Sequence, residues 1–228
     1  MLIRAVGLGG VSVNALLQID EVSHDFGGPA LFHNFSMTLP MGGQCLLVGP
    51  SGSGKSTLIN LICGFLKPRS GEIRIAGEAI SQGAEAARDA VRKRHVAVVF
   101  QSLRLVSALS VAGNLQLAAR LAGRAASQTD IALLLDELGI GEKANARPHQ
   151  LSQGQAQRAA VARALIARPS LLIADEPTSA LDDANAARVA DMLLRLASDH
   201  GTGLLVATHD VRLRPFFDKA IALEGVPA

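Results

Sequence analysis

The chain is poor in aromatic residues, in cysteine and in net charge. Its 228 residues include seven Phe but no Trp and no Tyr, which argues against single-stranded nucleic-acid binding by aromatic stacking. With 22 Lys and Arg against 20 Asp and Glu, the charge is too close to neutral for a polyanion binder that works by bulk charge. The two cysteines, Cys45 and Cys63, lie in apolar settings without a Cys/His cluster, so we expect buried thiols in a reducing compartment.

Long apolar runs are also missing, although 49% of the residues are hydrophobic and only 18% are charged, which excludes intrinsic disorder. The mean hydropathy is +0.28, yet no uninterrupted apolar run approaches the ~20 residues that span a bilayer. We therefore expect a soluble chain, able to contact a membrane protein without crossing the bilayer. Glycines interrupt the first fifteen residues, unlike a secretory signal. We interpret residues 1–16 as an N-terminal extension of a domain over residues 17–228.

Short apolar runs alternate with helical patterns along most of this domain. Apolar residues at helical spacing follow Asp130, a candidate N-cap, and again follow Asp182. This alternation predicts an α/β sheet with both faces covered. Alternating residues near 16–19 and 72–76 predict antiparallel strands, and residues 102–168 are expected to form a helical insert. The predicted buried parallel strands are Cys45–Val48, Val96–Phe100, Leu171–Ala174, Leu204–Ala207 and Ala220–Leu223.

A glycine-rich loop lies between the first of these strands and a helical stretch. Such a loop turns successive backbone N–H groups towards a triphosphate, because glycine accepts positive φ and lets the main chain approach closely. Lys55 is expected to reach the β- and γ-phosphates of ATP, and the Ser56 hydroxyl to ligate Mg²⁺, at the positive end of the next helix. The residues that fit G-x-x-x-x-G-K-[ST] are Gly49, Pro50, Ser51, Gly52, Ser53, Gly54, Lys55 and Ser56.

Two carboxylates follow the apolar run 171–174 and are predicted to lie at the carboxyl edge of the sheet. Asp175 suits a Mg²⁺ ligand, direct or through water, and Glu176 suits a general base for an attacking water. Acidic residues at strand ends also serve as helix N-caps. The phosphate-binding loop in the same chain favours the catalytic interpretation.

With Leu151-Ser152-Gln153-Gly154-Gln155 added, the sequence resembles the ATP-binding-cassette (ABC) ATPases from about residue 17 to 223. The resemblance implies a P-loop NTPase (RecA-like) parallel-sheet core, an N-terminal antiparallel β subdomain and a helical subdomain inserted at about 102–168. It extends the phosphate loop to Thr57, and it implies that Gln101 senses Mg²⁺ and the attacking water and that His209 contacts the γ-phosphate. Asp182 ends the D-loop motif that begins at Ser179.

The 151–155 motif also has a physical interpretation of its own. Ser152 and the N–H of Gly154 open a predicted helix from Gln155 to Ala167, and a helix N-terminus that carries a hydroxyl and a glycine is a second phosphate site. Two such sites suggest that two chains share each nucleotide. In the resembled family two cassettes pair head to tail, with each γ-phosphate between the P-loop of one and the signature of the other.

The sequence departs from the family pattern in two places. The third signature position is Gln153 rather than Gly. The aromatic residue that often stacks on adenine is not Tyr; Phe26 lies at a comparable place, while Phe32 and Phe35 compete for the role or belong to the core. The compact size and the local sequences around residues 110 and 148 resemble the lipoprotein-release, macrolide-efflux and cell-division branch.

The leading hypothesis is therefore the ATP-hydrolysing subunit of a transporter, which couples dimer closure to a separate integral membrane permease. It implies a cytoplasmic chain, held peripherally at the inner face of the plasma membrane, with a second cassette that is expected to be identical and no nucleic-acid partner. The alternatives are a soluble cassette ATPase acting on DNA or ribosomes, and a small-molecule P-loop kinase. The basic run over residues 88–94 is expected to be a solvated helix face, and leucines over residues 103–115 to be core or part of a permease groove.

Overall fold

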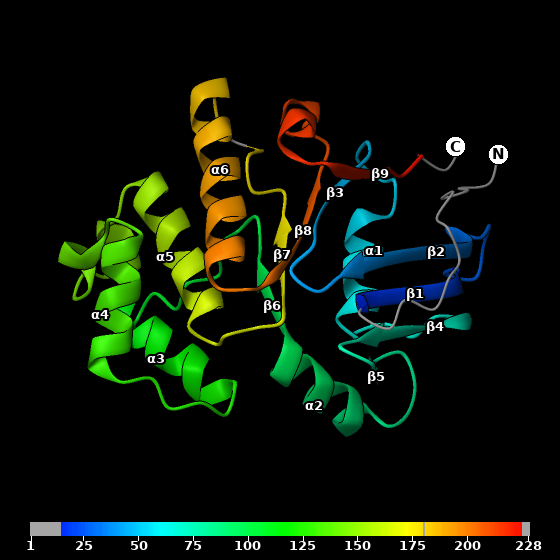
Figure 1. Cartoon of the computed structure of the whole chain (residues 1–228), viewed down its shortest axis with the longest axis horizontal. Helices are drawn as coiled ribbons and strands as arrows, with labels where there is room; N and C mark the ends of the chain where they lie inside the picture. The colour runs from blue at the N-terminus through cyan, green and yellow to red at the C-terminus, as the bar shows by residue number, and fades with distance from the viewer. Residues whose placement is uncertain (1–14, 180, 225–228) are drawn as a thin grey trace.

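The computed structural model describes residues 15–179 and 181–224. Five parallel strands form the central sheet, in the order β6-β7-β8-β3-β9, and each matches a predicted run to within one residue at either end. Figure 1 shows this sheet between a helical layer and a second, antiparallel sheet. The parallel strands are β3 (Gln44–Val48), β6 (Val96–Val99), β7 (Leu171–Asp175), β8 (Gly203–Thr208) and β9 (Lys219–Ala222).

The antiparallel sheet has the order β2-β1-β4-β5 and packs with α1 against one face of the central sheet. Its first strand begins at Ala15, two residues before the predicted domain boundary, and Leu16 is fully buried. The remainder of the predicted N-terminal extension, residues 1–14, lies outside the described residues. The strands of this sheet are β1 (Ala15–His24), β2 (Phe32–Pro40), β4 (Ser70–Ile75) and β5 (Glu78–Ala79).

The two cores lie on opposite faces of the central strands, which explains why those strands are apolar throughout. Leu171 and Ile173 of β7 pack with the antiparallel sheet and α1, whereas Leu172 and Ala174 pack with the helices on the other side. This division follows from the two-residue period of a strand. The helices are α1 (Lys55–Ile62), α2 (Glu85–His95), α3 (Val111–Leu121), α4 (Gln128–Glu137), α5 (Gln153–Leu165) and α6 (Asp183–Asp199).

Residues 102–168 contain α3, α4, α5 and two single-turn 3₁₀ helices, η1 (Gly141–Lys143) and η2 (Pro148–Gln150), and no strand. The predicted N-cap of α4 was wrong. Ser127 caps this helix, with its hydroxyl accepting from the Asp130 N–H at 3.0 Å. The Asp130 carboxylate accepts from the Ser127 backbone N–H, which completes a capping box.

The predicted solvated face of α2 was also wrong in part. Arg88 is buried, and its guanidinium donates to the carbonyls of Gly64 and Gly83 at 3.0 Å each. Arg92 donates to the Cys63 carbonyl at 2.8 Å. Cys63 and Gly64 follow the last turn of α1, and the carbonyls at the end of a helix have no intrahelical donors. Two arginines of α2 therefore cap the C-terminal end of α1.

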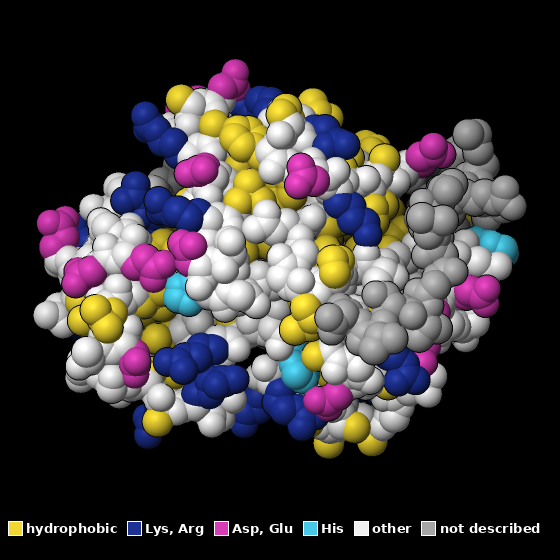
Figure 2. Space-filling model, viewed as in Figure 1, with side chains coloured by type: hydrophobic (Ala, Val, Ile, Leu, Met, Phe, Trp, Pro, Cys, Tyr) yellow, Lys and Arg dark blue, Asp and Glu magenta, His cyan; other side chains and the backbone are white. Residues whose placement is uncertain are grey.

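Both cysteines are buried and free, as expected. Burial raises the pKa of the Cys45 thiol to about 11 and that of Cys63 to about 12, so neither is a reactive thiolate. No helix within residues 15–179 and 181–224 has the length and apolar character needed to cross a membrane. On the face in Figure 2, charges of both signs are interspersed, and hydrophobic side chains gather where the 3₁₀ helix η3 (Val211–Phe216) lies beside α6.

Candidate functional site: a nucleotide site at the strand ends

Three neighbouring strands deliver the candidate residues to one edge of the sheet. Strands β7, β8 and β3 are adjacent and parallel, so their carboxyl ends lie together. The glycine-rich loop follows β3, Asp175 ends β7 and Glu176 comes next, and His209 follows β8. Residues separated by more than one hundred positions therefore meet at this edge.

The backbone of the loop needs its glycines. Gly52 and Gly54 have φ of +81° and +91°, and Gly54 is the N-cap of α1 without any side-chain cap. A Cβ on Gly54 would lie 2.9 Å from the Phe32 ring, and one on Gly49 would lie 2.5 Å from the Leu223 carbonyl oxygen. Within the described residues, the buried Ser53 hydroxyl has no hydrogen-bond partner. Uncapped N–H groups and an unpartnered hydroxyl suit a phosphate group.

Lys55 places a buried positive charge under this loop. Its side chain is 7% exposed, and its ammonium donates to the Gly49 and Pro50 carbonyls at 2.7 and 3.0 Å. The ammonium nitrogen also lies 3.4 Å from Oε1 of Glu176. The site thus joins a cation to the carboxylate that the sequence predicts as the general base.

Glu176 is held by donors on two sides. Its φ is +50°, and its carboxylate accepts from the Thr208 hydroxyl at 2.9 Å and from the His209 backbone N–H at 3.2 and 3.3 Å. Nδ1 of His209 lies 2.9 Å from Oε2. Burial alone would raise the pKa of Glu176, but the bonds from His209 and Thr208 outweigh it and lower this pKa below its usual value. Sequence reasoning gave Thr208 no role of its own.

Asp175 differs from its neighbour. Burial, followed by the adjacent Glu176 charge, raises the pKa of Asp175. Gln101, after β6, donates through Nε2 to the Ser179 hydroxyl at 3.1 Å and is exposed. Ser56 is exposed in the first turn of α1. The hydroxyl, amide and carboxylate oxygens of Ser56, Gln101 and Asp175 are the hard donors that Mg²⁺ accepts, and a divalent cation would offset the raised pKa of Asp175.

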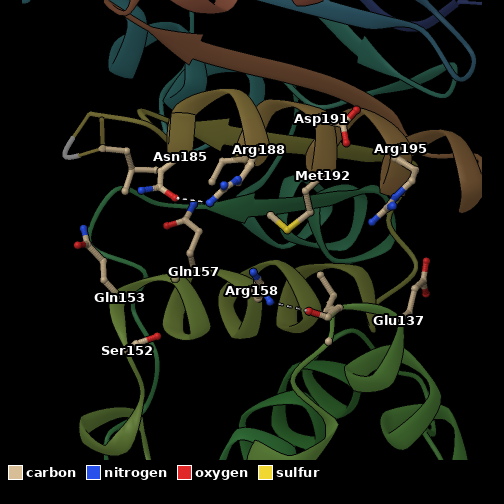
Figure 3. Close-up of a pocket in the computed structure, with 15 residues that line it drawn as sticks. Glu137, Ser152, Gln153, Gln157, Arg158, Asn185, Arg188, Asp191, Met192 and Arg195 are labelled. Atoms are coloured by element: carbon tan, nitrogen blue, oxygen red, sulfur yellow. Dashed lines mark hydrogen bonds between the residues drawn. The ribbon is translucent and has the colours of Figure 1, made fainter. Parts of the chain in front are cut away.

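The signature residues open α5, two residues earlier than predicted. Ser152 is the N-cap, with its hydroxyl accepting from the Gln155 N–H at 3.3 Å, while Oε1 of Gln155 accepts from the Ser152 N–H at 3.0 Å. Ser152 and Gly154 are exposed and line a cavity of about 650 Å³ between α5 and α6, with Arg158 and Arg188 on its walls (Figure 3). No residue of the glycine-rich loop lines this cavity. Within one chain, the two candidate phosphate sites are separate.

Two further candidates occupy defined positions. Asp182 is the N-cap of α6, and bonds from the backbone and side chain of Asn185 lower its pKa. Its neighbour in the predicted D-loop, Ala180, lies outside the described residues. Phe26 is 70% exposed and meets His24 edge-on at 4.9 Å between ring centroids, whereas Phe32 and Phe35 are fully buried core residues. Only Phe26 of the three presents an open ring.

A parallel sheet whose strand ends gather a glycine-rich loop, a buried lysine and two carboxylates defines a P-loop nucleoside triphosphatase. The family described as ABC transporter matches residues 32–179. The ABC transporter ATP-binding protein YbbA of Escherichia coli (strain K12), itself described as uncharacterized, is 40% identical over 189 residues, 82% of this chain and 83% of YbbA. The chain belongs to the ABC transporter family, as an ATP-binding subunit.

Two further comparisons agree with this assignment. The lipoprotein-releasing system ATP-binding protein LolD 1 of Rhodospirillum rubrum is 39% identical over 216 residues, 92% of this chain and 95% of LolD 1. The dimeric structure of MJ0796, a bacterial ABC transporter cassette, superposes with a TM-score of 0.78 at 31% identity, covering 91% of this chain and 94% of that one. The predicted fold class is confirmed, and transport is favoured over the DNA- or ribosome-acting alternative.

Proposed function

We propose that this chain hydrolyses ATP to ADP and phosphate with Mg²⁺ bound, and that two copies clamp the nucleotides between them. The observation that carries the proposal is the cluster of Lys55, Glu176 and His209 beside the glycine-rich loop. The Lys55 ammonium, which suits the phosphates, and the hydrogen-bonded Glu176 carboxylate, which suits the attacking water, are in contact with each other. The signature residues at the start of α5 do not support the alternative of a small-molecule P-loop kinase.

The loop from Gly49 to Thr57 binds the phosphates through backbone N–H groups, with Lys55 neutralising the β- and γ-oxygens. Ser56, Gln101 and Asp175 would hold Mg²⁺ directly or through water, and the cation would neutralise charge that develops on the phosphate oxygens. Phe26 offers its exposed ring to the adenine. The Mg²⁺ assignments rest on the donor types, and the Phe26 assignment rests on the exposure of its ring.

Glu176 acts as the general base that takes a proton from the attacking water. Its lowered pKa keeps it ionised at neutral pH, and Thr208 and His209 orient its carboxylate. His209 would also contact the γ-phosphate, and Gln101 would position the attacking water. Because Lys55 lies 3.4 Å from the same carboxylate, charge at the phosphates and charge at the base are coupled.

The second copy is proposed from the separation of the two phosphate sites. Ser152 and Gly154 are exposed at the start of α5, so a partner's nucleotide can reach them. A further MJ0796 structure, at 30% identity, is described as a dimeric post-hydrolysis state bound to ADP and Pi. We place the dimer on a separate integral membrane permease, at the inner face of the plasma membrane. The likeness to LolD 1 favours a compact transporter branch such as lipoprotein release.

The test combines Glu176→Gln with Lys55→Ala. Glu176→Gln should retain ATP binding and lower turnover by roughly 10²–10⁴-fold, the scale of a lost general base, and with ATP it should elute as a dimer in sizing chromatography. Lys55→Ala should weaken nucleotide affinity. Glu142→Gln, an exposed carboxylate on η1, is the matched control and should turn over normally. Near-normal turnover of Glu176→Gln would exclude this residue as the general base. A variant that stays monomeric with ATP would contradict the proposal that two chains share each nucleotide.

A further inference from the structure

A hydrogen-bonded network that the proposed reaction does not use runs beside the site. Its centre is Asp210, one residue after His209 and 7% exposed at the side chain. Oδ2 accepts from the buried Thr178 hydroxyl at 2.8 Å, and Oδ1 accepts from the Arg212 backbone N–H at 3.1 Å. Asp210 therefore links the segment after β8 to the segment after β7.

The Arg212 guanidinium binds Asp210 with two donors. Nε donates to Oδ1 at 2.7 Å and Nη2 to Oδ2 at 2.8 Å, the fork geometry that lysine cannot reproduce. The other side of the same guanidinium contacts the turn that enters α6: Nη1 donates to Asp183, and Nη2 to the Leu181 carbonyl at 3.3 Å. These two acceptors flank Asp182, the predicted D-loop residue.

The network also reaches the proposed base. The Asp210 backbone N–H donates to the Thr208 hydroxyl at 3.0 Å, and that hydroxyl donates to Glu176 at 2.9 Å. One continuous path of hydrogen bonds thus runs from the 181–183 turn through Arg212 and Asp210 to the carboxylate of Glu176. Figure 1 shows why the path is short: η3, which carries Arg212, lies beside the start of α6 at the carboxyl edge of the sheet.

We propose that Arg212 is a positioning residue that fixes the 181–183 turn relative to the Glu176–His209 pair. The inference rests on the proposed function, because the reaction that it serves is hydrolysis at Glu176. Removing the guanidinium frees the turn on one side and the Asp210 carboxylate on the other. The position of the D-loop segment and the position of the Glu176 carboxylate are then no longer fixed by one shared side chain.

The guanidinium of Arg212 has two arms, its bonds to Asp210 and its bonds to the 181–183 turn, and these differ in strength. Asp183 is 88% exposed, and water competes for an ion pair there, so this arm alone is weak. At the Asp210 arm the carboxylate is buried and the contact is bidentate, so this arm sets the geometry. Because neither arm touches the glycine-rich loop, the loss of Arg212 should affect kcat and leave ATP affinity nearly unchanged.

The kinetic test compares Arg212→Gln with Arg214→Gln. Arg214 lies on the same short helix but donates to the Phe217 carbonyl, outside the network. Arg212→Gln should lower kcat about tenfold, the scale of one lost charge-assisted hydrogen bond, with KM for ATP within about twofold. Arg212→Lys should not restore kcat, because one ammonium cannot serve both arms. Full kcat in Arg212→Gln, or full rescue by lysine, would overturn the proposal.

Hydrogen exchange supplies a readout that needs no turnover. Peptides covering residues 177–184 should exchange faster in Arg212→Gln than in wild type or Arg214→Gln, with peptides from β1 unchanged. Equal exchange over 177–184 would overturn the proposed tether even where kcat falls. Should the wild type hydrolyse ATP and lose that activity in Glu176→Gln while Arg212→Gln keeps full kcat, the proposed function would stand and this inference alone would fail.

Discussion

Replacing Asp210 by Asn should destabilise the fold in a pH-dependent manner. The carboxylate is 7% exposed and accepts both Arg212 donors and the Thr178 hydroxyl. The bond from Arg212 is the largest cause that lowers the Asp210 pKa, from 3.8 to about 2. Asparagine keeps a similar volume but loses the charge and turns an NH₂ group towards one of these donors.

The magnitude follows from the difference in pKa between the folded and unfolded states. At 1.36 kcal/mol for each pKa unit, a decrease from 3.8 to about 2 corresponds to about 2 kcal/mol of stability. Because the folded pKa is the lower one, this contribution is complete above pH about 4. It is lost as the pH falls through the unfolded and then the folded pKa, and roughly half should remain near pH 3.

Urea denaturation followed by far-UV circular dichroism measures this quantity. Wild type and Asp210→Asn should differ by about 2 kcal/mol at pH 7 and by roughly half of that at pH 3. Asp183→Asn is the matched control, because it removes the exposed partner of the same guanidinium and should cost under about 0.5 kcal/mol. A difference below about 0.5 kcal/mol at pH 7, or one that does not change with pH, would refute the reasoning.

Three other substitutions probe the remaining parts of the site and its support. Arg88→Ala should lower the free energy of unfolding by about 1–3 kcal/mol in urea titrations, because the Gly64 and Gly83 carbonyls lose their donors; an unchanged midpoint would contradict the capping role. Gly54→Ala should weaken nucleotide binding in calorimetry, since its φ is +91° and its Cβ would press on Phe32; wild-type affinity would show that the loop adapts. Phe26→Ala should cost about 1–3 kcal/mol of ATP affinity by loss of stacking, without changing the unfolding midpoint; equal affinity would exclude this ring as the base platform.

The central sheet could be predicted closely because burial on both faces removes polar residues from a strand. Leu172 and Leu171 point into different cores, so neither position tolerates a polar side chain and the ends of the run mark the ends of the strand. Helix starts were predicted less well. Ser127 and Asp130 are both good caps three positions apart, and the apolar period of α4 does not distinguish them.

The candidate site was predicted where its chemistry is contiguous in sequence. The glycine-rich loop carries a spacing that only a few structures satisfy, the Asp175-Glu176 pair gains its meaning from that loop, and the parallel order β7-β8-β3 brings the two together. Contacts between motifs were not predicted. No local pattern states that Lys55 lies 3.4 Å from Glu176, or that the Thr208 hydroxyl donates to it.

Arginines show most directly where sequence reasoning stops. Arg88 and Arg92 were expected in solvent because their charges repeat along a helix, yet Arg88 donates to the carbonyls of Gly64 and Gly83, and Arg92 donates to the Cys63 carbonyl besides pairing with Asp89. A backbone carbonyl is the same for every residue type, so no sequence pattern can mark it as an acceptor. Arg212 combines such an acceptor, the Leu181 carbonyl, with carboxylates two and 29 positions away. A guanidinium with five donors is the side chain best able to join partners of this kind. Its partners can be identified only once the ends of the strands and the starts of the helices have been placed in space.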